Sequence, residues 1–295
     1  MEKQNKYKNP LIEVFGFPPA NKTVKAKRYR SQKLCPYNNK VPNCTKDKAN
    51  NPLGVCSIKH KDATVITCPT RFREDWLIVE NAAAFAFGKN SKWTSISEVK
   101  LLDKNGQSAG NIDFVLVAYN KKGEVIDFTS LEVQGVYISG NLRNPFEAFL
   151  TNPSQKLEWP VGYNYPTPDY LSSSRKRLVP QMLYKGGVFK HWEKKQTVAL
   201  QKSFFDTLPE LPKTTKAKAD IAWFLYDLKY EKKTKQYNLQ LIETVYTEFE
   251  AALKTITTPK PSKLNDFIGI LQNKLDQHLE NNSPDTPSLK DIISK

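Results

Sequence analysis

The sequence lacks long apolar runs and a hydrophobic segment at its start. No stretch approaches the roughly 18 apolar residues that a membrane-spanning helix needs, which argues against an integral membrane protein. The first residues, MEKQNKYKNP, are polar and charged, so they lack the core of a secretory signal peptide. The sequence also has no internal repeat. We therefore expect a globular protein of the cytoplasm.

Histidine and acidic residues are both scarce. His60, His191 and His278 show no spacing typical of metal ligands or catalytic groups. The chain has 45 Lys and Arg against 30 Asp and Glu, a net charge of +15. Residues 1–61 hold 14 Lys and Arg against 3 Asp and Glu, a net charge of +11. Such a field attracts polyanions such as nucleic acids, although a basic surface that serves only solubility is the alternative.

Cysteine is absent from the last 227 residues. Cys35, Cys44, Cys56 and Cys68 are separated by eight, eleven and eleven residues in a segment rich in Asn, Pro, Gly and Lys. Disulfides are rare in the cytoplasm, whereas four thiolates suit a tetrahedral Zn or Fe site that would supply missing folding energy. The C-x2-C spacing of zinc knuckles is absent, so four unrelated buried thiols are the alternative.

Hydrophobic patterning predicts a mixture of helices and strands, an α/β protein. A helix is expected over 70–88, interior strands over 110–120 and 125–138, and a Gly-containing turn between them. Residues 144–171, rich in Pro, Asn and Tyr, predict a long functional loop.

The second half of the chain continues this mixture. Serines at its start predict a helix over 172–187, and residues 188–205 continue a helical pattern. Residues 220–231 predict a buried strand, followed by an amphipathic helix near 236–256. The remainder predicts a linker at 257–263, a helix at 265–280 and a loose tail at 281–295.

One predicted strand carries two polar residues on the same face. In SLEVQGVYISGN, residues 130–141, Glu132 and Gln134 are two positions apart, so their side chains point to the same side. Leu131 and Val133 lie on the other face and belong in a core. A carboxylate among β-forming residues indicates a metal or substrate site.

A second carboxylate is expected to join Glu132. Asp113 lies near the start of the preceding strand, and antiparallel pairing about a turn near 120–123 brings it close to Glu132. Two carboxylates on adjacent strands can hold Mg²⁺, which prefers oxygen ligands. Glu98, fifteen residues before Asp113, could add a further ligand. Ordinary edge or turn contacts of these acidic residues are the alternative.

Five runs carry a resemblance to a known family: EVFGFPP, PLGVC, AGNIDFVLV, LEVQGVYISGN and DYLSSSRKRLVPQMLYKGG. Over residues 12–228 the chain resembles the NotI family of type II restriction endonucleases. The resemblance implies a PD-(D/E)xK nuclease-like mixed sheet flanked by helices, and Mg²⁺-dependent cleavage of double-stranded DNA. It places Asp113, Glu132 and Gln134 on the catalytic motif, with glutamine where related nucleases have lysine, and matches Glu98 to a further acidic position.

The resemblance also bears on the cysteines and on the organisation of the chain. It matches the four cysteines to the ligands of an iron site beside the nuclease core, and it alone favours Fe over Zn. We expect a basic four-cysteine metal-binding module at 1–70 and a nuclease core with DNA-contacting loops at 71–256. A linker, helix and tail follow at 257–295. The family implies a prokaryotic cytoplasm.

Basic residues near the expected site are candidates for DNA contacts. Arg175, Lys176 and Arg177 follow three serines at an expected helix start, where charges and exposed N–H groups suit phosphates. Arg143 lies just beyond the strand that carries Glu132. A solvated basic face is the alternative for each of them.

The reaction implies that the protein acts together with a second copy of itself. Both DNA strands must be cut, and a twofold protein matches a palindromic site, so a homodimer is expected. A cognate DNA methyltransferase is expected to protect host DNA. Two other functions stay open at this point: a non-catalytic, metal-stabilised DNA-binding protein in which Gln134 marks a dead site, and a repair nuclease acting on structured DNA.

The cysteines give the first testable prediction. Freshly purified protein should contain one Fe or Zn per chain, because structural four-thiolate sites bind too tightly to empty readily. Elemental analysis checks this, and less than about half an equivalent of either metal would contradict it.

Overall fold

A computed structural model describes residues 7–38, 41–48, 50–153, 158–159, 164–258 and 261–281. The chain forms two compact units, residues 1–257 and 258–295. In the described part of the second unit lies α9 (Leu264–Asn281), which confirms the expected last helix. Residues 282–295 of the expected tail lie outside the described part. Among the described residues, none of the helices is long and apolar enough to cross a membrane.

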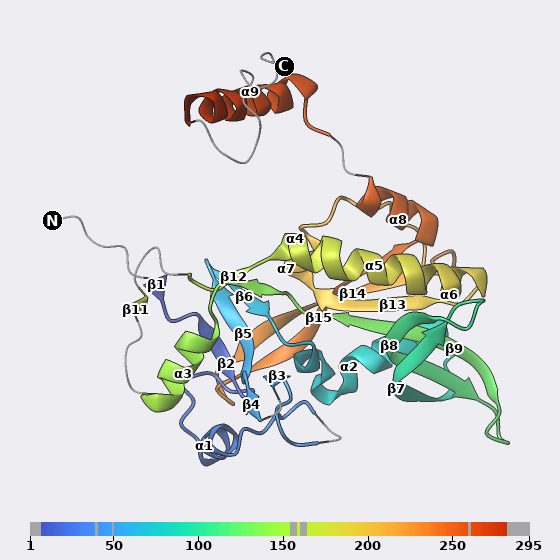
Figure 1. Cartoon of the computed structure of the whole chain (residues 1–295). Helices are drawn as coiled ribbons and strands as arrows, with labels where there is room; N and C mark the ends of the chain where they lie inside the picture. The colour runs from blue at the N-terminus through green and yellow to red at the C-terminus, as the bar shows by residue number, and fades with distance from the viewer. Residues whose placement is uncertain are drawn as a thin grey trace. The chain divides into compact units, whose positions relative to one another are not determined.

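A six-stranded mixed sheet forms the centre of the first unit (Figure 1). Its order is β15-β14-β13-β9-β8-β7. The strands are β7 (Lys92–Leu102), β8 (Ser108–Tyr119), β9 (Val125–Gln134), β13 (Gln196–Gln201), β14 (Ile221–Glu231) and β15 (Gln236–Thr247). Strand β13 runs parallel to both of its neighbours, whereas the other pairs are antiparallel. The expected strand pair that carries the acidic residues is therefore confirmed as β8–β9.

Helices cover both faces of this sheet, as expected for an α/β protein. Helix α2 (Leu77–Ala86) packs Ile78 and Val79 against Leu131 and Phe224 on one face. On the other face lies a continuous helical row (Figure 1). The row comprises α4 (Tyr170–Ser173), η2 (Ser174–Leu178), α5 (Val179–Gln181), η3 (Met182–Gly186) and α6 (Gly187–His191). Together with α8 (Phe249–Thr257), this row packs on a core that contains Trp223.

A smaller antiparallel sheet forms the N-terminal part. Its order is β2-β5-β6, with β2 (Leu11–Val14), β5 (Val55–His60) and β6 (Ala63–Ile66). Helix α1 (Val24–Ser31) is capped at its N-terminus by Thr23, whose hydroxyl accepts a hydrogen bond from the Ala26 N–H. Val14 and Val55 share one core cluster with Phe146 of α3 (Arg143–Thr151) and with Trp223. The small sheet is thus packed against the central one, while a boundary near residue 70 stays a prediction.

Short two-stranded pairs complete the described elements. They are β1 (Tyr7–Lys8) with β11 (Glu158–Trp159), β3 (Asp47–Lys48) with β4 (Asn51–Pro52), and β10 (Ile138–Ser139) with β12 (Thr167–Pro168). The short helix α7 (Lys202–Phe205) follows β13 directly.

The expected helical pattern over 188–205 is wrong in its middle. Residues 196–201, QTVALQ, form β13, and every residue of this strand is buried between β9 and β14. A short apolar run buried on both faces has no period that separates strand from helix. The helix expected near 236–256 is wrong in its first half, which is the edge strand β15, paired with β14 by tertiary contact; only α8 is helical.

Two further differences lie near the site. The helix expected at 70–88 is divided into the 3₁₀ segment η1 (Pro69–Trp76) and α2, because Asp75 and Trp76 have φ of 49° and 56°. Part of the expected loop at 144–171 belongs to α3. The helix expected at 172–187 is confirmed, with two π-helical turns, η2 and η3, inside it.

A buried ion pair links the small sheet to the central one. The Nε of Arg71 in η1 lies 3.0 Å from the Oε2 of Glu13 in β2, and both side chains are fully buried. Ser57 of β5 donates to the same carboxylate at 2.8 Å. The Nη2 of Arg71 donates to the backbone carbonyl of Tyr237 in β15 at 2.8 Å. One guanidinium thus joins β2, η1 and β15.

Removing this guanidinium should destabilise the fold. Arg71→Met leaves the buried Glu13 carboxylate without its partner, which costs about 3–5 kcal/mol in comparable cases. Chemical denaturation should show that loss, whereas the exposed Arg28→Met should leave stability nearly unchanged. Adding Glu13→Gln to Arg71→Met should recover part of the loss, and no recovery would contradict an electrostatic cause.

Candidate active site

The β8–β9 register places two carboxyl groups side by side in the middle of the sheet. Phe114 pairs with Leu131, so Asp113 stands opposite Glu132 at the next position. The backbone N–H of Val133 donates to the Oδ2 of Asp113 at 2.8 Å, which holds that carboxylate against β9. Glu132 is buried and Asp113 is half-buried. The structure therefore brings these two predicted residues together.

Lys185 contacts this pair from the helical row. Its Nζ lies 2.8 Å from the Oε2 and 3.0 Å from the Oε1 of Glu132. Lys185 belongs to the π-helical turn η3 and is itself buried. Two acidic groups and one ammonium thus form a buried cluster between the sheet and the helices.

Burial and mutual repulsion shift the protonation of both acids. Burial, reinforced by the charge of Asp113, raises the pKa of Glu132 to about 7, although Lys185 opposes the shift. Burial also raises the pKa of Asp113, against the opposing effects of the Val133 N–H and the charge of Lys185. Perturbed acids of this kind cluster at functional sites.

Gln134 lies on the same face of β9, two residues beyond Glu132, and is buried. Its Nε2 donates to the Gly135 carbonyl at 2.7 Å, which fixes the orientation of the amide. Gln134 brings hydrogen-bonding capacity to the site but no charge.

Glu98 is not brought into the cluster. The β7–β8 register places it across from Asp113, between the pairs Ser97–Phe114 and Val99–Ile112. However, Glu98 is exposed and has a φ of 58°, a departure from extended strand geometry. Within the described ranges, no three His, Cys, Asp or Glu side chains are grouped closely enough to hold a metal ion.

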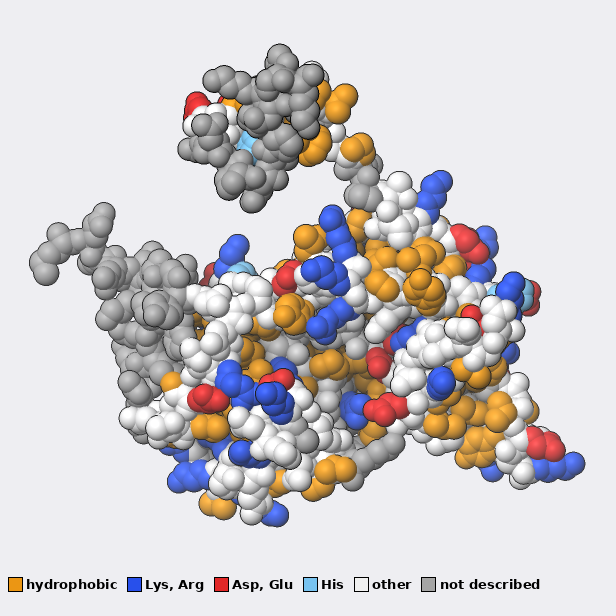
Figure 2. Space-filling model, in the orientation of Figure 1, with side chains coloured by type: hydrophobic (Ala, Val, Ile, Leu, Met, Phe, Trp, Pro, Cys, Tyr) orange, Lys and Arg blue, Asp and Glu red, His pale blue; other side chains and the backbone are white. Residues whose placement is uncertain are grey.

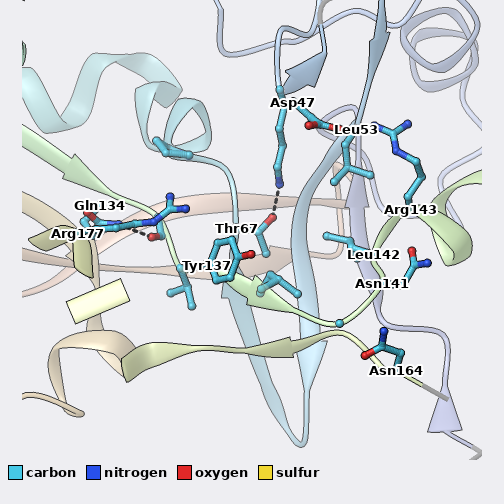
Figure 3. Close-up of a pocket in the computed structure, with 16 residues that line it drawn as sticks. Asp47, Leu53, Thr67, Gln134, Tyr137, Asn141, Leu142, Arg143, Asn164 and Arg177 are labelled. Atoms are coloured by element: carbon cyan, nitrogen blue, oxygen red, sulfur yellow. Dashed lines mark hydrogen bonds and ion pairs between the residues drawn. The ribbon is translucent and has the colours of Figure 1, made fainter. Parts of the chain in front are cut away.

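A pocket of about 720 Å³ adjoins the end of β9. Figure 3 shows Gln134 and Arg177 at one end of it, and Arg143 and Asn164 at the other. Lys46 also lines it, with its Nζ donating to the Thr67 hydroxyl and to the Val55 carbonyl, both at 2.7 Å. Neither Asp113 nor Glu132 belongs to the pocket wall, which meets the acidic cluster through Gln134.

The predicted DNA-contacting residues separate into two groups. Arg177 stacks over the Tyr137 ring at 4.8 Å and lines the pocket, whereas Arg175 and Lys176 are exposed beside it on η2. Arg143, at the start of α3, donates to Asp47 and to the Asn51 carbonyl. Figure 2 shows Lys and Arg side chains on both sides of a hollow in this face of the molecule.

The four cysteines lie in one region without forming a metal centre in the described part of the chain. Cys44, Cys56 and Cys68 are buried and Cys35 is partly buried. Burial raises the pKa of the Cys35 thiol to about 11, and Cys68 lies close enough to Cys35, Cys44 and Cys56 to add to this effect at each. Backbone N–H groups of Tyr37 and Asn38 donate to Cys35, and that of Lys46 donates to Cys44.

Sequence reasoning missed Lys185 and several residues of the pocket wall. The signal for Lys185 was a lysine directly before two glycines, LYKGG, inside an apolar helical pattern. Lys46, Asn141 and Asn164 line the pocket from segments without regular periodicity. Their proximity depends on contacts between distant parts of the chain, so no local pattern indicated it.

The pKa of Glu132 gives a prediction for stability in metal-free protein. Its value is raised from 4.5 to about 7, so the folded chain holds a proton that the unfolded chain releases between these values. The stabilising contribution is complete below pH 4.5 and is lost as pH rises through 7, by on the order of 3 kcal/mol. Glu132→Gln should remove this fall in unfolding free energy between pH 5 and about 8.

Denaturant titrations in EDTA at the two pH values measure the effect. Glu250→Gln, at a carboxylate that is 69% exposed, is the control and should keep the pH dependence of the parent chain. An unchanged pH dependence in Glu132→Gln would contradict the assignment.

Comparison with known proteins places this site in a family. Residues 21–239 match the family model described as restriction endonuclease NotI. No curated protein matches the chain. The match covers more than half of the chain and includes Asp113, Glu132 and Gln134. The chain therefore belongs to the NotI family of restriction endonucleases and is a type II site-specific deoxyribonuclease.

Proposed function

We propose that this chain hydrolyses phosphodiester bonds at a specific, palindromic sequence of double-stranded DNA, with Mg²⁺ as its catalytic metal and a PD-(D/E)xK-like active site. The observation that carries the proposal is the pair of carboxyl groups of Asp113 and Glu132 on neighbouring strands of the central sheet. Burial there strengthens electrostatic interactions with a substrate phosphate.

The donor set of this pair fits Mg²⁺. This ion prefers hard oxygen ligands and is commonly held by one or two carboxylates together with waters. The pKa of both carboxyl groups is raised by burial, and a cation between them relieves their repulsion. When bound, the metal supplies charge neutralisation at the phosphate and favours ionisation of the attacking water.

Residues of the chain then position the carboxylates and the attacking water. The Val133 N–H holds the Asp113 carboxylate in place, and Glu132 faces it from the adjacent strand. Gln134, two residues further along the same face, is placed to orient the attacking water with its amide. Glu98 is proposed as an accessory acidic residue at most, because its side chain is exposed.

DNA is proposed to lie across the pocket beside Gln134. Arg177 and Arg143 stand at its two ends, and Arg175 and Lys176 extend the basic surface from the first of them. Basic side chains on both sides of a concave surface suit the two backbones of a duplex. Lys46 is added as a further phosphate contact from the four-cysteine segment.

The four cysteines are proposed to hold one structural iron. The convergence of Cys35, Cys44 and Cys56 on Cys68 supports this, as do the backbone N–H groups that donate to two of the sulfurs. Such N–H donors stabilise thiolates, the form of cysteine that binds metals.

The enzyme is proposed to act as a homodimer, since a twofold assembly cuts both strands of a palindrome symmetrically. Its place of action is proposed to be the cytoplasm of a prokaryote, beside a DNA methyltransferase that modifies the same sequence. The non-catalytic alternative does not agree with membership of an endonuclease family.

Phage DNA incubated with the protein and Mg²⁺ tests the proposed reaction. Discrete fragments are expected. Cleavage restricted to junctions or lesions would show a repair nuclease, and no cleavage under any condition would contradict the proposal.

Asp113→Asn tests whether the proposed catalytic residues carry out the cleavage. The change removes one negative ligand while keeping the shape of the side chain, so cleavage should fall by roughly 1,000-fold or more. Binding to a cognate duplex in Ca²⁺ should persist or tighten, because one charge near the phosphate is gone. Asp62→Asn, at an exposed turn, is the control and should cleave normally. Near-normal cleavage by Asp113→Asn would show that the chemistry lies elsewhere.

A further inference from the structure

The proposed active site has a deficit of positive charge on its catalytic strand. Asp113 and Glu132 are two acids, and Gln134, the next residue on their face, is neutral. A phosphate in the reaction develops further negative charge, and enzymes stabilise such charge with fixed cations and hydrogen-bond donors. A cation should therefore reach this position from another element.

Lys185 is placed to be that cation. Its ammonium donates to both oxygens of Glu132, at 2.8 and 3.0 Å, and its charge acts on Asp113 as well. Arg73 also acts on Asp113, but its guanidinium stacks over the Phe114 ring at 5.0 Å. If the proposed Mg²⁺ is held by the two carboxylates and binds the substrate phosphate, that phosphate also lies close to Lys185.

The surroundings of Lys185 hold its backbone close to the sheet. A Cβ on Gly186 would lie 2.6 Å from the Phe249 ring and 3.0 Å from the Gln196 side chain, so only glycine allows this approach. The Gln196 amide donates to the Gly186 carbonyl at 3.1 Å. On the facing strand, a Cβ on Gly110 would lie 3.3 Å from the Cε of Lys185. Gly186 thus lets the helix approach α8 and β13, and Gly110, whose φ is 110°, leaves room for the lysine side chain.

This arrangement is costly for stability alone. Gly186 and Gly187 are consecutive glycines in a helix, and each costs roughly 1 kcal/mol relative to alanine. The ammonium is withdrawn from water, a cost that a buried ion pair repays only in part. Single π-helical turns within an α-helical row, such as η3, are frequent at functional sites.

We propose that Lys185 is a catalytic residue that donates to the phosphate under attack, supplying from the helical row the charge that Gln134 does not supply from β9. This inference rests on the proposed function. In the hydrolysis, water adds to phosphorus and the bond from phosphorus to the leaving sugar oxygen breaks. The water loses a proton and the leaving oxygen gains one, while Lys185 keeps its own protons and acts by charge.

Single-turnover cleavage of a cognate duplex at saturating Mg²⁺ tests the role of Lys185. Lys185→Met should lower the rate by at least about 100-fold, as removal of one charge-stabilising donor does elsewhere. Its affinity for the duplex in Ca²⁺ should stay within about threefold of the parent chain, which also shows that it is folded. Lys185→Arg should keep an intermediate rate, because it keeps the charge.

The matched control is Lys190→Met, four residues after the end of η3, where an ion pair with Asp220 at 2.9 Å is lost away from the acidic cluster. It should cleave at the parent rate. Adding Gln134→Lys to Lys185→Met should recover at least about tenfold, because the charge returns from the strand. If Lys185→Met does not bind DNA, Lys185→Gln takes its place with the same expectations.

The outcomes separate this inference from the proposed function. A neutral variant at 185 that cleaves within about threefold of the parent, while Asp113→Asn is inactive, would show that Lys185 is only a counterion of Glu132. Failure of Gln134→Lys to recover activity would likewise overturn the inference. Cleavage by both the neutral variant and Asp113→Asn would overturn the proposed active site, whereas no cleavage by the parent chain would overturn the proposed function.

Discussion

The ion pair of Arg71 with Glu13 is the contact on which the relative placement of the two sheets depends. It is fully buried, and the guanidinium also reaches Glu74 and the Tyr237 carbonyl, so β2, η1 and β15 meet at one group. The segment η1 leads directly into α2, which covers the face of β9 opposite to Glu132. Its first residue, Pro69, approaches Gly135 so closely that a Cβ there would lie 3.1 Å away. The end of β9 is thus positioned by the segment that follows the N-terminal sheet.

Burial of the Asp113 and Glu132 carboxyl groups favours the presence of a cation beside them. Two carboxyl groups with raised pKa lie beside one buried ammonium, that of Lys185, which pairs with Glu132 and acts on Asp113 by its charge. Electrostatic interactions are stronger there than at the surface, so each added or removed charge has a large effect. The strand contributes acids and a neutral amide, and the helical row contributes the cation. The proposed catalytic groups therefore come from two layers of the fold, the sheet and the helical row.

The four-cysteine segment has a second role beside the metal site proposed for it. Lys46, two residues after Cys44, crosses to the Thr67 hydroxyl next to Cys68, and Lys46, Asp47 and Thr67 all line the pocket. Asp47 in turn holds Arg143 at the far end. The segment that carries the thiols therefore shapes the basic wall opposite Arg177. Between Cys35 and the start of β5 at Val55, the described residues form only the short strands β3 and β4, so a metal at the cysteines would stabilise the proposed DNA-facing surface as well as the module.

Local patterns in the sequence determined the α/β class, the β8–β9 hairpin with Asp113 opposite Glu132, and the clustering of the cysteines. A turn fixes register between neighbouring strands, so such pairs can be read along the chain. Tertiary structure alone decided that QTVALQ is a central strand, since burial on both faces erases the periodicity that separates strand from helix. It alone also brought Lys185 to Glu132, 53 residues away, and left the Glu98 side chain exposed, at a residue with a positive φ. Contacts across such separations follow from packing of the whole core, which no local window contains.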